Sequence, residues 1–167
     1  MVMKLGIYGG TFNPPHLGHL TSAQAAMDVL GLDRLQFVPA ALPPHKQLPA
    51  GSPGPQERLA MVELAADSLL LPQTIGVNAL GLSRPGKSYT ADTLEQIHGQ
   101  YPDAELWLMM GTDMFLTLQN WWEPERITRL AGVCTFARTQ SDSGEALNIQ
   151  SEYLQKTFGA KTCVLQL

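Results

Sequence analysis

The stretch Gly6–Leu20 most limits what this chain can fold into, because it reads GIYGGTFNPPHLGHL. A short apolar run, Lys4–Tyr8, predicts a strand that breaks at two glycines. An Asn-Pro-Pro turn follows, and the pattern after it predicts a helix. A helix N-terminus offers unpaired N–H groups and a partial positive charge, and glycines let a ligand approach the main chain. The stretch therefore predicts a strand–turn–helix unit that binds phosphate.

Two histidines stand at the start of this predicted helix. His16 and His19 are three residues apart, so their imidazoles face the same side, and Gly18 leaves room beside them. Histidine donates hydrogen bonds and can be protonated near neutral pH, which suits a phosphate chain. The alternatives are two ordinary histidines in a helix cap or a zinc pair, and the preceding run Gly9–Pro14 favours phosphate. A Rossmann dehydrogenase would need Gly-x-Gly-x-x-Gly, and this turn lacks the third glycine.

Strand-like and helix-like patterns alternate along the rest of the chain. This alternation predicts right-handed crossovers and a Rossmann-like α/β fold with three α/β/α layers around a mostly parallel sheet. No linker divides the sequence, so the chain 1–167 is expected to form a single domain. The later strands are predicted at Leu35–Val38, Thr74–Leu80, Glu105–Met110, Val133–Ala137 and Thr162–Leu167. The helices are predicted at Leu17–Leu30 (closed by Gly31), Gln56–Leu69, Thr90–His98, Thr112–Leu118, Glu125–Leu130 and Gly144–Phe158.

The composition excludes several classes of partner. A formal net charge of −4 argues against a general nucleic-acid binder. Cys134 and Cys163 match no metal or redox spacing and are expected to be buried reduced thiols. The N-terminus does not resemble a signal peptide, and no apolar run approaches the roughly 20 residues of a membrane span. We therefore expect a cytoplasmic protein without a membrane partner.

The opening motif resembles that of the nucleotidyltransferase superfamily, Gly-Gly-Thr-Phe-Asn/Asp-Pro followed by His-x-Gly-His. Four later motifs, in this order, are similar to those of the bacterial nicotinate-nucleotide adenylyltransferases. They are Pro43-Pro44-His45-Lys46, Ser88-Tyr89-Thr90-Ala91-Asp92-Thr93-Leu94, Gly111-Thr112-Asp113 and Trp121-Trp122-Glu123. The resemblance covers the chain from Lys4 to about Arg138.

The resemblance implies adenylyl transfer from Mg-ATP to nicotinate mononucleotide, which gives nicotinate adenine dinucleotide and pyrophosphate in NAD biosynthesis. It implies Mg²⁺ as the cofactor, carried by ATP, with no metal site built from protein side chains. No covalent intermediate is needed, so the protein would supply positioning and charge stabilisation. The residues that would bind ATP are Gly9, Gly10, Thr11, Phe12, His16, Gly18, His19, Gly111 and Asp113, and those that would act in catalysis are His16, His19 and Lys46.

The resemblance also implies a nicotinate mononucleotide site formed by Asn13, His45, Lys46, Tyr89, Thr90, Trp121 and Arg138. Tyr89 and Thr90 would offer main-chain N–H groups to the nicotinate carboxylate, and Trp121 would stack on the pyridine ring, with Trp122 next to it. Plainer alternatives stay open: a solvated loop at His45-Lys46, an N-cap at Ser88 or Thr90, and core or lid packing of the tryptophans, of which at least one should be partly exposed.

Two features depart from the family pattern. Arg138 is followed by Thr-Gln-Ser, where the family commonly has Pro-Gly. Family members also continue past the last strand into an Ile-Ser-Ser-Thr-x-Ile-Arg motif that binds the triphosphate, and the sequence ends at Leu167 before such a motif. Two alternatives stay open: a related adenylyltransferase with another phosphate acceptor, and, because the C-terminal motif is absent, a nucleotide-binding module with little turnover. It does not indicate an oligomeric state.

Overall fold

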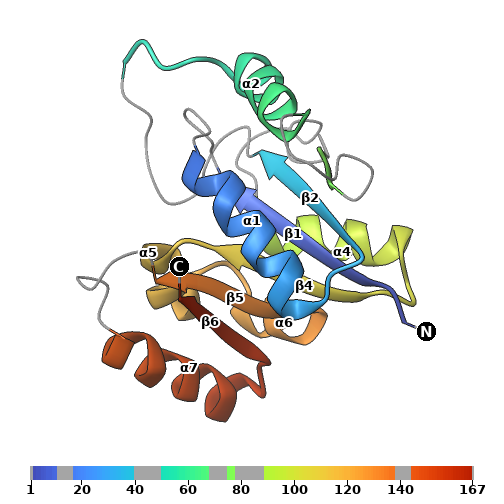
Figure 1. Ribbon diagram of the computed structural model, residues 1–167. Coiled ribbons are helices and arrows are strands. Elements are labelled where there is room, and N and C mark those ends of the chain that lie inside the picture. Colours follow the sequence, from blue (N-terminus) through green and yellow to red (C-terminus); the bar gives the residue numbers. More distant parts are fainter. Residues whose placement is uncertain are drawn as a thin grey trace.

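A six-stranded parallel sheet forms the centre of the protein in a computed structural model, which describes residues 2–10, 17–39, 50–67, 75–77, 89–137 and 144–166 (Figure 1). The strand order is β3-β2-β1-β4-β5-β6, and each pair of neighbours is parallel. The strands are β1 (Lys4–Gly10), β2 (Arg34–Pro39), β3 (Ile75–Val77), β4 (Glu105–Met110), β5 (Ala131–Ala137) and β6 (Thr162–Gln166).

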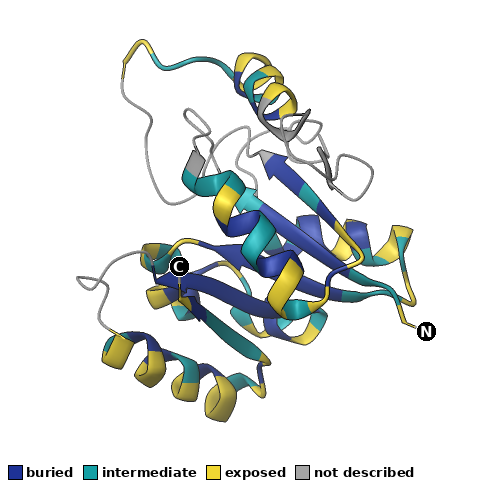
Figure 2. Cartoon of the chain, in the orientation of Figure 1, coloured by how far each residue is buried: buried dark blue, intermediate teal, exposed yellow. Residues whose placement is uncertain are grey.

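Helices cover both faces of this sheet. One face packs against α1 (Leu17–Leu30) and α2 (Pro55–Asp67), whose buried residues join those of the sheet in one apolar cluster. The other face packs against a second group of helices in a second cluster. These are α4 (Thr90–Gln100), α5 (Thr112–Leu116), the 3-10 turn η1 (Leu118–Asn120), α6 (Pro124–Leu130) and α7 (Gly144–Phe158). The central strands β1, β4 and β5 are largely dark blue in Figure 2 because most of their residues are buried, whereas the edge strand β6 is mostly half-buried and teal. The predicted three-layer α/β/α fold class is confirmed.

The order of the strands reverses between β1 and β4, which are neighbours in the sheet although five of the described elements separate them in the chain. Ligands of open α/β sheets bind at such a switch point, beyond the carboxyl ends of the strands. The last pair of the β1–β4 ladder is Tyr8 with Met109. The residues that follow on the two strands, Gly9–Gly10 and Met110–Gly111, therefore lie next to each other. The fold therefore brings two of the glycine motifs to one place.

Aromatic rings support the carboxyl half of the sheet on the α1 side. Tyr8 is 3% exposed and stacks between Phe37 and Phe136, with ring centroids 5.6 Å and 5.7 Å away. The ring of His19 meets Tyr8 edge-on at 5.8 Å. This aromatic row (Phe37, Tyr8 and Phe136) forms a rigid base beneath the first turn of α1.

Several predicted boundaries differ from the structure, each for a local reason. The first strand does not break at its glycines, because Gly9 and Gly10 still pair with Val38 and Pro39 of β2. The helix predicted at Thr112–Leu118 ends at Leu116, since the Thr117 hydroxyl lies 3.2 Å and 3.3 Å from the carbonyl oxygens of Asp113 and Met114 and competes for them.

Other ends agree or lie outside the described residues. Gly31 closes α1 with a φ of 66°, and the N–H of Leu32 donates to the carbonyl of Met27, which confirms the predicted cap. Strand β5 begins at Ala131, two residues before its prediction, because its first residues pair with β4. The outer parts of the predicted elements Gln56–Leu69 and Thr74–Leu80 lie outside the described residues.

The two cysteines are neighbours in space. Cys134 of β5 pairs in register with Cys163 of β6, and neither forms a disulfide. Cys134 is buried as predicted, whereas Cys163 is half-buried, because it lies on the edge strand. The Cys134 side chain hydrogen-bonds to Cys163 and lowers the pKa of the Cys163 thiol to about 7. Within the described part of the chain, no helix is long and apolar enough to cross a membrane.

Candidate active site

The first part of the candidate site is the junction of β1 with α1. A Cβ added to Gly9 would meet no atom of the described residues within 4 Å, so these residues leave the main chain there open to a ligand. The first turn of α1 holds Gly18 and the half-buried His19 and contains no acidic residue. Such a helix end has unpaired N–H groups and a partial positive charge. Both glycines and the imidazole therefore fit an anion.

The second part follows β4. Gly111 caps α5, and a Cβ added to it would meet no atom of the described residues within 4 Å. The exposed Asp113 lies in the first turn of that helix. The Thr117 hydroxyl connects this turn with Trp121, whose indole N–H donates to Thr117 Oγ1 at 3.4 Å. A carboxylate in this position can accept hydrogen bonds from hydroxyl groups, which fits the predicted contact of Asp113 with ATP.

The third part is the N-terminus of α4, where the predicted carboxylate contacts lie. The N-cap is Tyr89 rather than Ser88 or Thr90, and its side chain makes no capping hydrogen bond. The first-turn N–H groups of α4 thus have no cap from Tyr89 and point to the carboxyl edge of the sheet. The Tyr89 ring lies 5.6 Å from that of Trp122 at a tilt of 39°. This pair forms an aromatic wall beside the helix end.

The two adjacent tryptophans differ in their surroundings. Trp122 is 56% exposed, which confirms that at least one of the pair reaches solvent, whereas Trp121 is 8% exposed and belongs to the core cluster. The predicted stacking role of Trp121 therefore requires that its remaining open edge or face line the ligand pocket. The sequence pattern did not single out Trp122 for a role, although its exposed ring contacts a predicted site residue.

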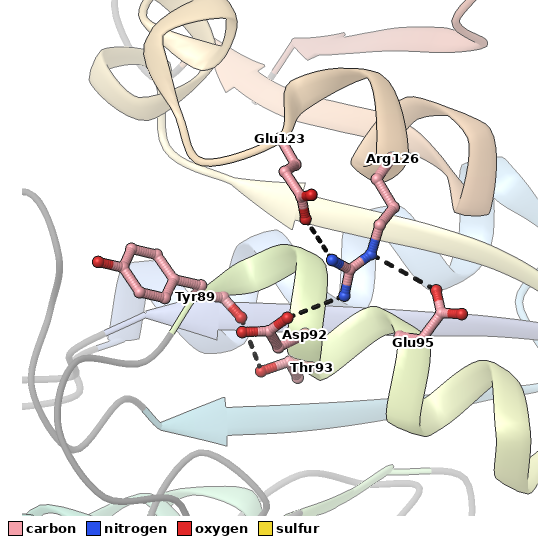
Figure 3. A network of polar contacts seen from close by, with 6 residues as sticks. All are labelled: Tyr89, Asp92, Thr93, Glu95, Glu123 and Arg126. Carbon is pink, nitrogen blue, oxygen red and sulfur yellow. Dashed lines mark hydrogen bonds and ion pairs between the residues drawn. The ribbon is translucent and has the colours of Figure 1, made fainter.

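Arg126 of α6 forms a network of ion pairs next to this wall, shown in Figure 3. Its guanidinium contacts Asp92 at 2.8 Å, Glu95 at 3.6 Å and also Glu123. The hydrogen bond to Asp92, with further contributions from Glu123, raises the pKa of Arg126 above its ordinary value. The sequence analysis did not predict a role for this residue. The pattern that could have indicated its ion pair is the three-residue spacing between Glu123 and Arg126 at the start of a helix.

The remaining predicted site residues lie outside the described part of the chain. They are Thr11, Phe12, Asn13, His16, His45, Lys46 and Arg138. Among the described residues, no group of three or more His, Cys, Asp or Glu side chains could hold a metal ion. The donors present at the helix ends and glycines are N–H groups and imidazole, which suit phosphate oxygens; a divalent ion would be held by those oxygens.

A cavity of about 760 Å³ lies at the other end of the strands, near their amino ends. The starts of β4 and β5, the end of α4 and residues just before β6 line it, including His98, Glu105 and Lys161. None of the predicted site residues is among its lining residues. Because ligands of parallel sheets bind at the carboxyl ends of the strands, this cavity does not belong to the candidate active site.

Comparison with known proteins identifies the family. The family model described as cytidylyltransferase-like matches residues 7–161. A relative from Citrifermentans bemidjiense, described as "Probable nicotinate-nucleotide adenylyltransferase", is 43% identical over 164 residues, which cover 96% of this chain and 71% of the relative. A relative of the same description from Geobacter sulfurreducens is 39% identical over 146 residues, 87% of this chain and 65% of the relative. The chain thus spans about two thirds of the length of these curated relatives.

Solved structures agree on the fold. The chain superposes on "Plasmodium falciparum nicotinic acid mononucleotide adenylyltransferase complexed with NaAD" with a TM-score of 0.79, over 99% of this chain and 75% of that one. The same enzyme "complexed with APC" gives a TM-score of 0.76. The identity is 16% in both, so this likeness concerns the fold alone. The sequence comparisons carry the assignment further: the chain belongs to the cytidylyltransferase-like family and, within it, to the nicotinate-nucleotide adenylyltransferases.

Proposed function

We propose that this protein transfers the adenylyl group of Mg-ATP to nicotinate mononucleotide, a step of NAD biosynthesis. The observation that carries the proposal is the switch point between β1 and β4. There, Gly9–Gly10 at the end of β1 and Gly111 just after β4 lie beside the first turn of α1. Such a place binds phosphate groups of a nucleotide. Family membership indicates which nucleotides these are.

The reaction needs an in-line displacement and no covalent enzyme intermediate. A phosphate oxygen of the mononucleotide forms a bond with the α-phosphorus of ATP, and the bond from that phosphorus to the bridging oxygen of pyrophosphate breaks. The protein's part is to align the two phosphates and to stabilise the negative charge that develops. Magnesium, held by phosphate oxygens, would supply further charge neutralisation when it is bound.

The described residues divide this work between two ends of the site. The N–H groups of α1, together with His19, would hold the phosphates of ATP, and Gly111 with Asp113 would receive the adenosine ribose. The first-turn N–H groups of α4, which Tyr89 does not cap with its side chain, would receive the nicotinate carboxylate beside the Tyr89–Trp122 wall. His16, His45, Lys46 and Arg138 remain predicted phosphate contacts.

The test of the activity is pyrophosphate release with three acceptors. We expect turnover with nicotinate mononucleotide to exceed turnover with the amide form and with pantetheine phosphate. If pantetheine phosphate were the best acceptor, the proposed substrate would be wrong. Calorimetry distinguishes the remaining alternative, because a binding module would take up the mononucleotide without forming pyrophosphate.

Two substitutions test the division of roles. His16→Ala is expected to lower turnover by about 100-fold, with little change in mononucleotide affinity, because imidazole would act on the charge of the transition state. Trp121→Ala should mainly weaken mononucleotide affinity, because stacking acts on ground state and transition state alike. Equal losses of both quantities in both variants would contradict the assignment.

A further inference from the structure

Arg126 connects two elements that are 34 residues apart in the chain and that both border the proposed carboxylate pocket. One is the start of α4, where Asp92 lies in the first turn and Glu95 in the next. The other is the turn before α6, which carries Trp122 and Glu123. The guanidinium is a planar fork, so it can contact carboxylates of both elements at once in a fixed geometry. Figure 3 shows it placed between them.

On the α4 side, the contact with Asp92 fixes the turn that bears the pocket. Arg126 Nη2 lies 2.8 Å from Asp92 Oδ1. One turn earlier, the carbonyl of Tyr89 accepts hydrogen bonds from the N–H of Thr93 at 3.2 Å and from its hydroxyl at 3.4 Å. By fixing the position of Asp92, Arg126 therefore also fixes the first turn of α4 and the N–H groups that follow Tyr89.

On the other side, Arg126 stabilises a residue in an unfavourable conformation. Glu123 has a φ of 49° and a ψ of 61°, the left-handed region, and it precedes Pro124. A non-glycine residue rarely adopts this region, and the residue before a proline is pushed further towards extended conformations. The Glu123 carboxylate pairs with Arg126, and its carbonyl accepts the N–H of Arg126 at 3.1 Å. Relaxation of Glu123 would turn Trp122, its neighbour in the chain, away from Tyr89.

These contacts would contribute little to global stability. The side chains of Asp92, Glu95 and Glu123 are 44%, 55% and 38% exposed, and ion pairs at such exposure are weak and screened by salt. What they determine is the relative position of two short segments. The local charge matters as well, because three carboxylates face a single guanidinium and would repel an anionic ligand if that cation were removed.

We propose that Arg126 is a positioning residue: it holds the first turn of α4 and the Trp122 turn at the separation that receives the carboxylate of a pyridine mononucleotide. The inference rests on the proposed function, since it assigns the carboxylate to that place. Arg126 itself need not touch the substrate. Its effect reaches the ligand through the N–H groups of α4 and through the direction of the Trp122 ring.

The main experiment is calorimetric binding of nicotinate mononucleotide, its amide form and ATP to the full chain. Arg126→Ala should weaken binding of nicotinate mononucleotide by about tenfold, the amide form less, and ATP by no more than about twofold. Arg126→Lys should recover part of this loss, since it restores the charge without the fork. Arg129→Ala is the control, because Arg129 is exposed and lies one turn further along α6. Equal weakening for ATP and nicotinate mononucleotide, or none for either, would overturn the proposal.

Asp92→Asn separates positioning from simple charge and also serves if Arg126→Ala fails to fold. It removes one negative charge near the pocket, so a purely electrostatic role of Arg126 predicts tighter binding of nicotinate mononucleotide. A positioning role predicts weaker binding, because the grip on the first turn of α4 is loosened. Tighter binding in this variant would therefore contradict the proposal.

A readout without ligand keeps this proposal distinct from the proposed function. The emission of Trp122, obtained by subtracting the spectrum of Trp122→Phe, should be more readily quenched by acrylamide in Arg126→Ala than in the unaltered protein. Unchanged quenching would mean that Arg126 does not hold the turn. If nicotinate mononucleotide failed to bind the unaltered protein, the proposed function would fail, while the quenching result would still decide whether Arg126 positions Trp122.

Discussion

Thr135 offers the sharpest test of the packing in the core, because its hydroxyl is buried and has no hydrogen-bond partner in the part of the chain that the structure describes. The residue lies in β5 and is 0% exposed, and no hydrogen bond to Oγ1 is found among the described residues. Alternation along the strand places it on the same face as Val133 and Ala137, both members of the core cluster beneath α4 to α7. A hydroxyl that loses its water without gaining a partner costs about 1–3 kcal/mol.

Thr135→Val replaces this hydroxyl with a methyl group of nearly the same shape. The penalty disappears and apolar burial is added, so we expect the free energy of unfolding to rise by about 1–2 kcal/mol. Valine also suits the interior of a strand. For a chain of this length the midpoint of thermal unfolding should rise by about 3–6 °C. Urea and thermal unfolding followed by circular dichroism would measure both quantities.

Thr128→Val is the matched control, since this threonine is also buried but has partners. Its hydroxyl lies 3.1 Å from the carbonyl oxygen of Pro124 and 3.2 Å from that of Glu125. The same substitution there removes a hydrogen bond and should destabilise the protein by about 1 kcal/mol. If both variants changed stability in the same direction, or if Thr135→Val were destabilising, the reasoning from the unpartnered hydroxyl would be refuted.

Two further predictions concern a close contact and a thiol. Gly132→Ala would place a Cβ 2.7 Å from two ring carbons of the buried Trp107 and should cost about 1–3 kcal/mol in urea unfolding. A Cβ at Gly99 would meet no described atom within 4 Å, so Gly99→Ala should instead stabilise α4 by about 0.5–1 kcal/mol. An unchanged stability of Gly132→Ala would mean that the Trp107 ring can move. The pKa of Cys163 is lowered to about 7 by the hydrogen bond from Cys134, so its thiolate forms as the pH rises through 7 and alkylation by iodoacetamide should reach half its maximal rate there. Cys134→Ala should move this midpoint up towards the ordinary thiol value of about 8.5, and an unchanged midpoint would exclude Cys134 as the cause.

Local sequence patterns predicted the fold well because its elements are marked by local chemistry. The apolar run Glu105–Met110 became β4 with the predicted bounds, and Gly31 closes α1 in the left-handed conformation that glycine adopts easily. Errors arose where partners distant in the sequence decide the outcome. The ladder with β2 carries β1 on through Gly9 and Gly10, although glycines in isolation indicate a break.

The sequence motifs predicted which strand ends would meet at the candidate site, but not how buried each side chain is or which residues it contacts. The glycine motifs that end β1 and β4 do come together, because parallel strands bring their carboxyl ends to one edge. The sequence could not distinguish the buried Trp121 from the exposed Trp122, since both follow the same helix and differ only in tertiary packing. The pairing of Arg126 with Asp92 was equally hidden, because it joins residues 34 positions apart.

The aromatic row of Phe37, Tyr8 and Phe136 has a consequence for the energetics of binding. These rings join β2, β1 and β5 in the core, so the amides around them should exchange with solvent only when the whole domain unfolds. His19 rests edge-on upon Tyr8 and takes its orientation from this base. If His19 contacts the nucleotide as proposed, its imidazole is already oriented by this ring contact, and binding would lose less conformational entropy at that position than at a freely rotating side chain.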